Sequence, residues 1–394
     1  MLKDFSIQAL FMGVLTAFVG FASSFAVVLQ GLQAMGATDG QAASGLMALS
    51  ISMGICGIVL SAITRLPISI AWSTPGAALL ASTGAIEGGY NGAVGAFVMC
   101  AALIIVAGLF KPLGRAVAAI PAPLANAMLA GVLLGLCFAP VKAIAFDPLL
   151  GLPIVLAWIV VGAFRRLWAV PAALGVFALV LTFGVDIADG ALASIGRSLV
   201  PTIEIVRPAI NLEGLVSVAL PLFIVTMASQ NIPGIAVLKV NLYDPKPGPL
   251  FAVTGFFSVL SAPFGGHAVN LAAITAAMCA GQDAHPDPKR RYWAALISGA
   301  GYVVFGLLAG VVTAFVALAP PILIQAVAGL ALVGAFSGSA MAAFQAPESR
   351  EAAAITFLVT ASGVSLAGIS GAFWGLAAGG LMLALSRIVQ VARK

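Results

Sequence analysis

The sequence is poor in charge and in the residues from which enzyme and metal sites are usually built. Only 8% of its 394 residues are charged, and it contains 2 histidines and 4 cysteines. The cysteines show neither CxxC nor metal-ligand spacing and lie in apolar segments, which indicates small core residues: Cys56, Cys100, Cys137 and Cys279. No nucleophile–base set or phosphate-binding glycine loop is found either, so we expect no metal and no cofactor, and an intramembrane enzyme acting on a lipid or quinone is disfavoured.

Hydrophobic residues, by contrast, make up 62% of the chain, which excludes an ordinary soluble domain. Apolar runs of about 20 residues recur from end to end, and each is long enough to cross a hydrocarbon core about 30 Å thick. The net charge of +5 comes from basic residues scattered without interleaved aromatics, so the lipid bilayer explains it better than nucleic acid does. The first run is too long for a signal-peptide core and lacks a clear cleavage site, so we expect it to stay as a span.

The hydrophobic pattern predicts an all-α polytopic membrane protein with fourteen spans. These lie near residues 8–34, 41–63, 67–86, 90–110, 117–140, 148–164, 168–187, 214–238, 249–262, 264–282, 291–317, 320–341, 352–368 and 370–388.

The distribution of lysine and arginine provides an independent check on this count. If the N-terminus is cytoplasmic, 15 of the 18 basic residues fall on the inside and 3 on the outside, the latter being Lys142, Arg197 and Arg207. The inside set comprises Lys3, Arg65, Lys111, Arg115, Arg165, Arg166, Lys239, Lys246, Lys289, Arg290, Arg291, Arg350, Arg387, Arg393 and Lys394. Both termini are therefore predicted to be cytoplasmic.

The longest polar connection, from Asp186 to Glu213, divides the chain into halves with seven predicted spans each. Because seven is odd, the second half must start from the opposite face of the membrane, which is the arrangement of an inverted repeat. We therefore predict a first repeat over 1–187, an extracytoplasmic connection over 188–213 and a second repeat over 214–394.

The third and tenth spans contain residues that interrupt a plain helix. The segment ISIAWSTPGAALLAS (Ile68 to Ser82) begins as a short extended stretch, after which Thr74 is a suitable N-cap and Pro75 fits the first helical turn. The segment APFGGHAVNLAAITAA (Ala262 to Ala277) likewise begins with proline and glycine and continues as an alanine-rich helix. Both are predicted to be broken spans with a short extended segment.

Two broken spans related by an inverted repeat would meet near the membrane midplane. Each half-helix N-terminus carries about +0.5 of an elementary charge, so a site between them favours an anion. No lysine or arginine falls in the middle of a predicted span, so we expect the N–H groups near Thr74 to Ala77 and Val269 to Ala272 to bind a carboxylate.

Other polar residues inside predicted spans are further candidates. Gln230 and Asn231 lie in the eighth span, within TMASQNIPG, either as helix–helix hydrogen bonds or as ligands of substrate or backbone at the cavity. Ser23 and Ser24 are weaker candidates, because serines commonly bond their own helix backbone. His267 is either a proton carrier or a fixed ring that orients the extended segments. All 13 acidic residues fall in loops or at span ends, so the sequence shows no carboxylate proton relay.

Three segments together resemble the bacterial benzoate membrane transport family of benzoate–proton symporters. They are IAWSTPGAALL (Ile70 to Leu80), ASQNIPG (Ala228 to Gly234) and GGHAVNLAAITAA (Gly265 to Ala277), and the resemblance covers the whole chain. That family in turn resembles the uracil–proton symporters, so the resemblance implies a seven-plus-seven inverted repeat. Spans one to four and eight to eleven would form a core domain, and spans five to seven and twelve to fourteen a gate domain.

The resemblance places the substrate between the third, eighth and tenth spans. The residues expected to bind it are Trp72, Ser73, Thr74, Gly76, Gln230, Asn231, Gly266, His267, Asn270, Ser23 and Phe21, with His267 as the candidate for proton coupling. Gln230 falls where uracil carriers have a substrate-binding glutamate, and Val269 falls near their second one. Losing both carboxylates removes repulsion against an anion, which favours an aromatic carboxylate. Its ring would pack against aromatic walls, for which Trp72, Phe18, Phe21 and Phe264 are candidates.

The sequence therefore predicts a secondary active transporter of the bacterial inner membrane that imports benzoate or a related aromatic carboxylate with protons, by an elevator-type movement of core against gate. An uncoupled uniporter or channel for small organic anions is the alternative. The expected partners are the benzoate-like substrate, protons and the lipid bilayer, with no nucleic acid. Carriers of the related fold are often dimers through the gate domain, so a homodimer is an expectation by analogy.

Overall fold

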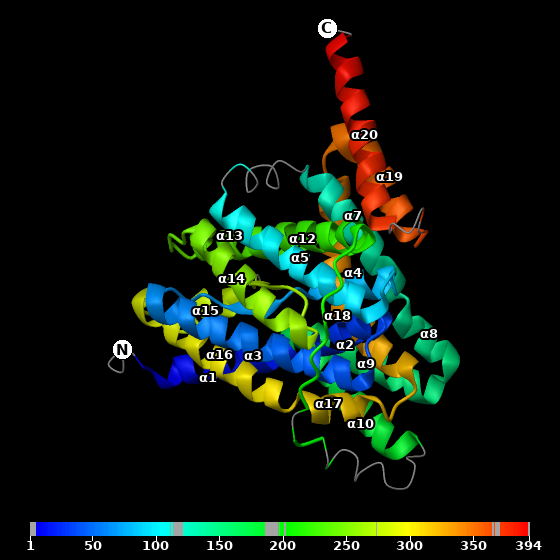
Figure 1. Cartoon of the computed structure of the whole chain (residues 1–394). Coiled ribbons are helices and arrows are strands. Elements are labelled where there is room, and N and C mark those ends of the chain that lie inside the picture. Colours follow the sequence, from blue (N-terminus) through cyan, green and yellow to red (C-terminus); the bar gives the residue numbers. More distant parts are fainter. Residues whose placement is uncertain are drawn as a thin grey trace.

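A computed structural model describes residues 5–110, 112, 121–185, 196, 198–200, 202–272, 274–364, 366 and 371–392. Some residues named above lie outside the described ones, namely part of the predicted connection 188–213, Asp186, and the basic residues Lys3, Lys111, Arg115, Arg197, Arg393 and Lys394. Within the described part the regular secondary structure is helical apart from one sheet of two short strands (Figure 1).

The elements up to residue 184 are α1 (Ile7–Ala22), α2 (Phe25–Ala34), α3 (Asp39–Thr64), β1 (Ile70–Trp72), α4 (Thr74–Thr83), α5 (Gly89–Leu109), α7 (Ala122–Cys137), α8 (Ala139–Phe146), α9 (Pro148–Phe164), a 3-10 turn (Arg166–Trp168) and α10 (Ala169–Gly184). The later elements are a π-helical stretch (Gly214–Ala219), α12 (Leu220–Thr226), a second π-helical stretch (Met227–Asn231), α13 (Ile232–Val240), α14 (Pro247–Ser261), a 3-10 turn (Ala262–Phe264), β2 (Val269–Leu271), α15 (Ile274–Ala280), a 3-10 turn (Pro288–Arg290), α16 (Tyr292–Leu307), α17 (Ala309–Val316), α18 (Pro321–Phe344), a 3-10 turn (Pro347–Ser349), α19 (Arg350–Ala361) and α20 (Gly371–Ala392).

The chain is a polytopic membrane protein. In its described part, eight helical segments are long and apolar enough to cross a bilayer, or nine if the pair Pro288–Leu307 and Ala309–Val316, bent by 55°, is one span. The predicted third and tenth spans are not among them, because each consists of a strand followed by a short helix. The total of fourteen spans therefore stays a prediction.

The predicted first span differs from the observed one in the middle. Its helix ends at Ala22 and starts again at Phe25, and between them Ser24 has φ −149° and ψ −1°, outside helical geometry. Two adjacent serines that bond backward to the same carbonyl, that of Gly20, occupy the break. Hydropathy alone could not locate this interruption, because both flanking segments are apolar.

The helices pack mainly within two groups. In the first, α3 and α1 pack against α16, α5 packs against α14, and α2 packs against α4 (Figure 1). In the second, α7 packs against α18 and α19, α9 against α10, and α19 against α20. Glycines permit close approach in the first group, since a β-carbon added to Gly54 would lie 2.5 Å from the Gly299 carbonyl oxygen, and one added to Gly299 would lie 2.6 Å from that of Gly54.

Strands β1 and β2 lie inside the first group and join segments about 200 residues apart in the sequence. They are antiparallel, with Ile70 opposite Leu271, Ala71 opposite Asn270 and Trp72 opposite Val269. The pairing extends one residue further at each end, where the Ser73 N–H donates to the Ala268 carbonyl (2.9 Å) and the Ala272 N–H to the Ser69 carbonyl (3.0 Å). Backbone polar groups in an apolar interior need such partners, so the two extended segments satisfy each other.

Candidate functional site

The helix α4 begins where β1 leaves the strand pair. Ser73 is its N-cap, because the Ser73 hydroxyl accepts a hydrogen bond from the Gly76 N–H (3.1 Å) and the Ser73 carbonyl accepts one from the Ala77 N–H (2.8 Å). The expectation that Thr74 is the cap was therefore wrong by one residue. Pro75 lies in the first turn, as expected. Because Ser73 accepts hydrogen bonds from two N–H groups of the first turn, the start of α4 offers a ligand the Thr74 side chain rather than a row of free backbone N–H groups.

The N–H groups of the second extended segment also have protein partners, contrary to our expectation that they would bind substrate. The Val269 N–H donates to the Ser258 hydroxyl (2.8 Å), the Leu271 N–H to the Asn231 Oδ1 (2.9 Å), and the Ala272 N–H to Ser69. The sequence could not reveal this, because the acceptors Ser258 and Asn231 lie in helical segments 11 and 40 residues away, and Ser69 lies 203 residues away in the other extended segment.

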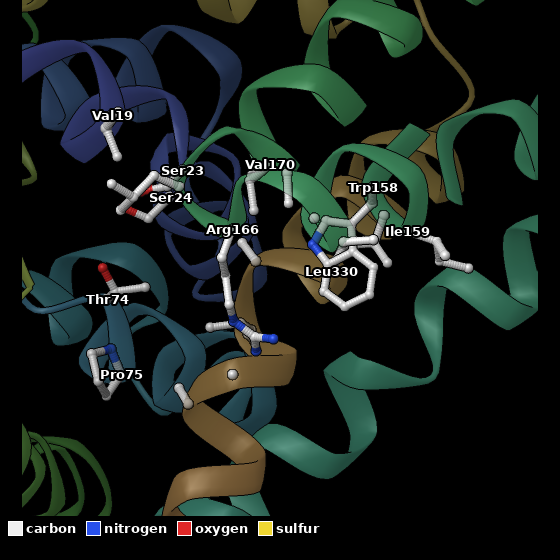
Figure 2. Close-up of a pocket in the computed structure, with 18 of the residues that line it drawn as sticks. Val19, Ser23, Ser24, Thr74, Pro75, Trp158, Ile159, Arg166, Val170 and Leu330 are labelled. Atoms are coloured by element: carbon white, nitrogen blue, oxygen red, sulfur yellow. The ribbon is translucent and has the colours of Figure 1, made fainter. Parts of the chain in front are cut away.

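A cavity of about 670 Å³ lies in front of the α4 N-terminus, between the two groups of helices. This volume is within the range of about 300 to 1,000 Å³ that is typical of small-molecule sites. Its polar wall is made of Ser23, Ser24, Thr74 and Gln230 from the first group. The opposite wall consists of residues of α9, α10, α18 and the turn before α10, including Trp158, Ile159, Arg166, Leu167, Val170 and Leu330 (Figure 2).

A smaller cavity of about 70 Å³ shares Ser23, Ser24, Thr74 and Gln230 with the large one and continues toward the strand pair. Its further lining includes Trp72, Thr275 and Tyr302. The indole N–H of Trp72 donates to the Ser24 hydroxyl (2.9 Å), which fixes that serine at the break between α1 and α2. The break, the strand pair and the eighth predicted span thus converge on one polar wall.

The structure separates the predicted site residues into two sets. Four of them line the cavities, namely Ser23, Trp72, Thr74 and Gln230. The others belong to the packed interior behind that wall and are not among the described lining residues: Ser73, Gly76, Asn231, Gly266, His267, Asn270 and Phe21. The site residues predicted from the resemblance therefore include both the cavity surface and the layer that holds it in place.

Several residues in this second set have an evident packing role. Phe21 stacks on Phe25 and on Phe305, with ring centroids 5.5 and 5.0 Å apart, so it is not a wall of the cavity. A β-carbon on Gly76 would overlap the Leu222 side chain and lie 2.7 Å from the Ser73 hydroxyl, so this glycine permits close packing rather than lining the cavity. Phe18 and Phe264, also expected as walls, are not among the described lining residues.

The adjacent amides of the eighth predicted span have different surroundings. Gln230 is half-buried and reaches both cavities. Asn231 is fully buried, and its Oδ1 accepts the Leu271 N–H while its Nδ2 donates to the Met227 sulfur (3.2 Å). Both lie in the π-helical stretch Met227–Asn231, where the extra residue per turn changes which side chains share a face. Asn231 is therefore a backbone ligand, as one of our alternatives proposed.

His267 and Asn270 are fully buried in the extended segment before α15. The His267 Nδ1 accepts a hydrogen bond from the Ala268 N–H (2.7 Å), so the proton of the neutral ring is on Nε2. The ring lies edge-on to Phe97, with centroids 6.3 Å apart. Asn270 donates from Nδ2 to the Leu271 carbonyl (2.8 Å). Both side chains brace the backbone of this segment.

Two cavity residues, Arg166 and Trp158, were not expected from the sequence. Arg166 was counted among the cytoplasmic loop charges, yet its side chain extends into the middle of the large cavity (Figure 2). Trp158 contributes an aromatic wall from α9. The turn Arg166–Trp168 between two apolar helices was the available signal, but hydropathy does not say which turn faces a cavity.

In the described part of the chain, no group of three or more histidine, cysteine and acidic side chains is placed to hold a metal ion.

Comparison with known proteins finds relatives that match nearly the whole chain. The model of the family described as benzoate membrane transport protein matches residues 3–385. The inner membrane protein YdcO of Escherichia coli (strain K12) is 38% identical over 380 residues, covering 96% of this chain and 95% of that protein. A benzoate membrane transport protein of Acinetobacter baylyi is 30% identical over 378 residues, covering 96% and 94%.

The fold is also found among solved structures of transporters. The transmembrane domain of the cyanobacterial bicarbonate transporter BicA matches with a TM-score of 0.56 at 16% identity, covering 98% of this chain and 97% of that one. SLC26A9 matches with a TM-score of 0.60 at 12% identity, covering 99% and 67%. At these identities the likeness concerns the fold alone. The family match over nearly the whole sequence places this chain among membrane transporters rather than enzymes, and the chain belongs to the benzoate membrane transport protein family.

Proposed function

We propose that this protein is a secondary active transporter that imports benzoate or a related aromatic carboxylate together with protons across the bacterial inner membrane. The observation that carries the proposal is the cavity at the start of α4, whose described lining contains hydroxyl and amide groups but no carboxylate. Such a lining donates hydrogen bonds to an anion without repelling it, and the positive end of the α4 dipole adds to the attraction.

The substrate carboxylate would bind at the polar wall and the ring at the apolar one. Thr74 and Gln230 supply donors on one side of the cavity, beside the Ser23 hydroxyl, which already donates to the Gly20 carbonyl. Trp158 and Leu330 supply apolar surface on the other side (Figure 2). The expected participation of the tenth predicted span is then indirect. Its extended segment holds α4 and Asn231 in place through the strand pair.

The cavity lies between two bodies that would move against each other. The helices expected to form the core domain are those of the first packing group, and those expected to form the gate domain are those of the second, which supports the proposed seven-plus-seven repeat and an elevator-type movement. The excess of lysine and arginine on one set of connections supports cytoplasmic termini. A homodimer through the gate domain remains a proposal by analogy.

Of the two roles considered for His267, we propose that of a fixed ring. Taking up a second proton would require Nδ1 to release the buried Ala268 N–H, and the ring does not line either cavity. The coupled proton then travels on water or on the substrate's own carboxylate, which is the acidic group brought into the cavity.

Replacing His267 with asparagine tests this proposal, because the asparagine oxygen can accept the same N–H. We expect His267→Asn to keep benzoate accumulation driven by a pH gradient within about threefold of the original rate, whereas His267→Leu leaves a buried donor unpaired, at a cost of about 1–3 kcal/mol, and lowers the yield of folded protein. Uptake would be compared in proteoliposomes at matched protein content. Exchange of internal for external benzoate that persists in His267→Asn after gradient-driven accumulation is lost would instead identify His267 as the proton carrier.

The substrate class is tested by counterflow in proteoliposomes loaded with unlabelled benzoate. We expect entry of labelled benzoate that competing aromatic carboxylates inhibit, and little inhibition by benzamide, which has the ring without the charge, or by uracil. Equal inhibition by benzamide would contradict recognition of the carboxylate. An uncoupled uniporter or channel for small organic anions is the second candidate, and the pH-gradient experiment described at the end of the Discussion separates it from the symporter.

A further inference from the structure

The large cavity contains one feature that the proposed function does not use, a cation on the wall opposite α4. Among the described residues that line this cavity, Arg166 is the sole charged one. It belongs to the turn between α9 and α10, and its guanidinium lies between Thr74 and Pro75 on one side and Trp158 and Leu330 on the other (Figure 2). Its charge therefore faces the same space as the hydroxyl and amide donors.

The wall beneath the guanidinium is shaped to leave it room. Gly334 of α18 also lines the cavity, and the Arg166 Nη2 lies 3.4 Å from the position that a β-carbon on Gly334 would occupy. An alanine at this position would make an ordinary van der Waals contact, whereas a larger side chain would occupy the place of the guanidinium. Gly334 thus fixes where the charge can lie without contributing a polar group.

Fewer backbone N–H groups are available to bind an anion than the start of α4 and the extended segment before α15 would provide if their N–H groups were free. Ser73 occupies the N–H groups of Gly76 and Ala77, and the Val269, Leu271 and Ala272 N–H groups bond to the protein. Four neutral polar side chains face the cavity from the core side, but the Ser23 and Ser24 hydroxyls already donate to the Gly20 carbonyl, so Thr74 and Gln230 are left to donate to an anion. Neutral donors orient a carboxylate, but a full countercharge requires a cation, and a guanidinium binds a carboxylate through two parallel hydrogen bonds.

From this geometry we propose that Arg166 is the countercharge of the substrate carboxylate and the residue that makes the site select anions over neutral aromatic compounds. The inference rests on the proposed function, since it concerns the same cavity. In it the carboxylate is held between Arg166 on the gate side and Thr74 with Gln230 on the core side, so the anion links the two bodies that move. Trp158 and Leu330 line the same cavity and offer the substrate ring an apolar surface beside this charge pair.

Equilibrium binding of labelled benzoate to the purified full-length protein in lipid nanodiscs tests the proposal. We expect Arg166→Gln to weaken benzoate binding by about tenfold or more, as loss of a charge-assisted bidentate contact does. We also expect it to reduce the preference for benzoate over benzamide. The matched control is Arg165→Gln, which removes the preceding arginine, one that is not among the described lining residues, and should leave the affinity within about twofold because exposed charges outside the cavity are screened.

A second pair of variants keeps the charge and changes only its place. Gly334→Leu should weaken benzoate binding as Arg166→Gln does, whereas Gly334→Ala should bind normally, and both should fold because Gly334 is exposed. Unchanged affinity and unchanged preference for the anion in folded Arg166→Gln would overturn the role of Arg166 while leaving the proposed function intact. Absence of aromatic carboxylate binding by the unmodified protein would instead overturn the proposed function, and the inference with it.

Discussion

Replacing Gln230 with alanine is expected to lower benzoate transport at least about tenfold without reducing the amount of folded protein. The Gln230 side chain is half-buried and is the one amide among the described residues that reaches both cavities. A hydrogen bond to a charged group contributes about 1.5–3 kcal/mol, which corresponds to a roughly 10- to 150-fold change in affinity. The measurement is the initial rate of labelled benzoate uptake, normalised to protein in the membrane.

A glutamate at the same position should have a larger effect. Gln230→Glu places a negative charge in a cavity whose described lining has no other acidic side chain, so repulsion is added to the lost donor. The control is Ser229→Ala, because the neighbouring Ser229 hydroxyl donates to the Val225 carbonyl of its own helix and Ser229 is not among the described lining residues. Transport by Gln230→Ala at the rate of Ser229→Ala would remove Gln230 from the site.

The adjacent amide should respond differently, since Asn231→Leu is expected to reduce the amount of folded protein rather than substrate affinity. Asn231 is fully buried, and its Oδ1 accepts the Leu271 N–H at 2.9 Å, so leucine leaves a buried backbone donor unpaired at a cost of about 1–3 kcal/mol. Leucine also has to fit a site where Gly234 already approaches β2 closely, because a β-carbon on Gly234 would lie 2.7 Å from that of Leu271. The readouts are membrane yield and the midpoint of thermal unfolding.

Asn241→Leu is the matched control for this variant. Asn241 follows α13, and its Nδ2 bonds to the Val237 carbonyl of the same helix, so its loss breaks no link between segments. Asn231→Leu protein that accumulates and unfolds like Asn241→Leu, yet no longer binds benzoate, would show that Asn231 contacts the substrate directly.

Much of the architecture was predictable because it depends on local chemistry. Proline and glycine mark the places where a helix cannot continue, so the extended segments that became β1 and β2 were expected, and α9 has the predicted bounds of 148–164. Cavity positions were less predictable. Ser73 and Thr74 are both good caps, and only the backbone geometry decides that the first of them is used.

The opposite wall of the cavity shows a second limit. Nothing in the sequence pattern distinguishes Arg166 and Trp158 from other residues in or next to an apolar helix, so neither was predicted to line the site. Their position depends on how α9, α10 and α18 pack across from α4, and that is a property of contacts between distant segments. Likewise, no local sequence pattern indicates that the Ser258 hydroxyl and the Asn231 side-chain oxygen accept hydrogen bonds from backbone N–H groups of the tenth predicted span.

Proton symport of benzoate is tested most directly by uptake of labelled benzoate into liposomes that contain the purified protein, with an inward proton gradient that is then collapsed by a protonophore. We predict accumulation above the equilibrium distribution that is lost when the gradient is collapsed. The control is protein-free liposomes, which correct for benzoic acid that crosses the bilayer unaided. Protein-dependent entry that only equilibrates, with or without the gradient, would contradict proton symport and indicate a uniporter or channel. Absence of benzoate flux in folded protein would contradict the proposed substrate.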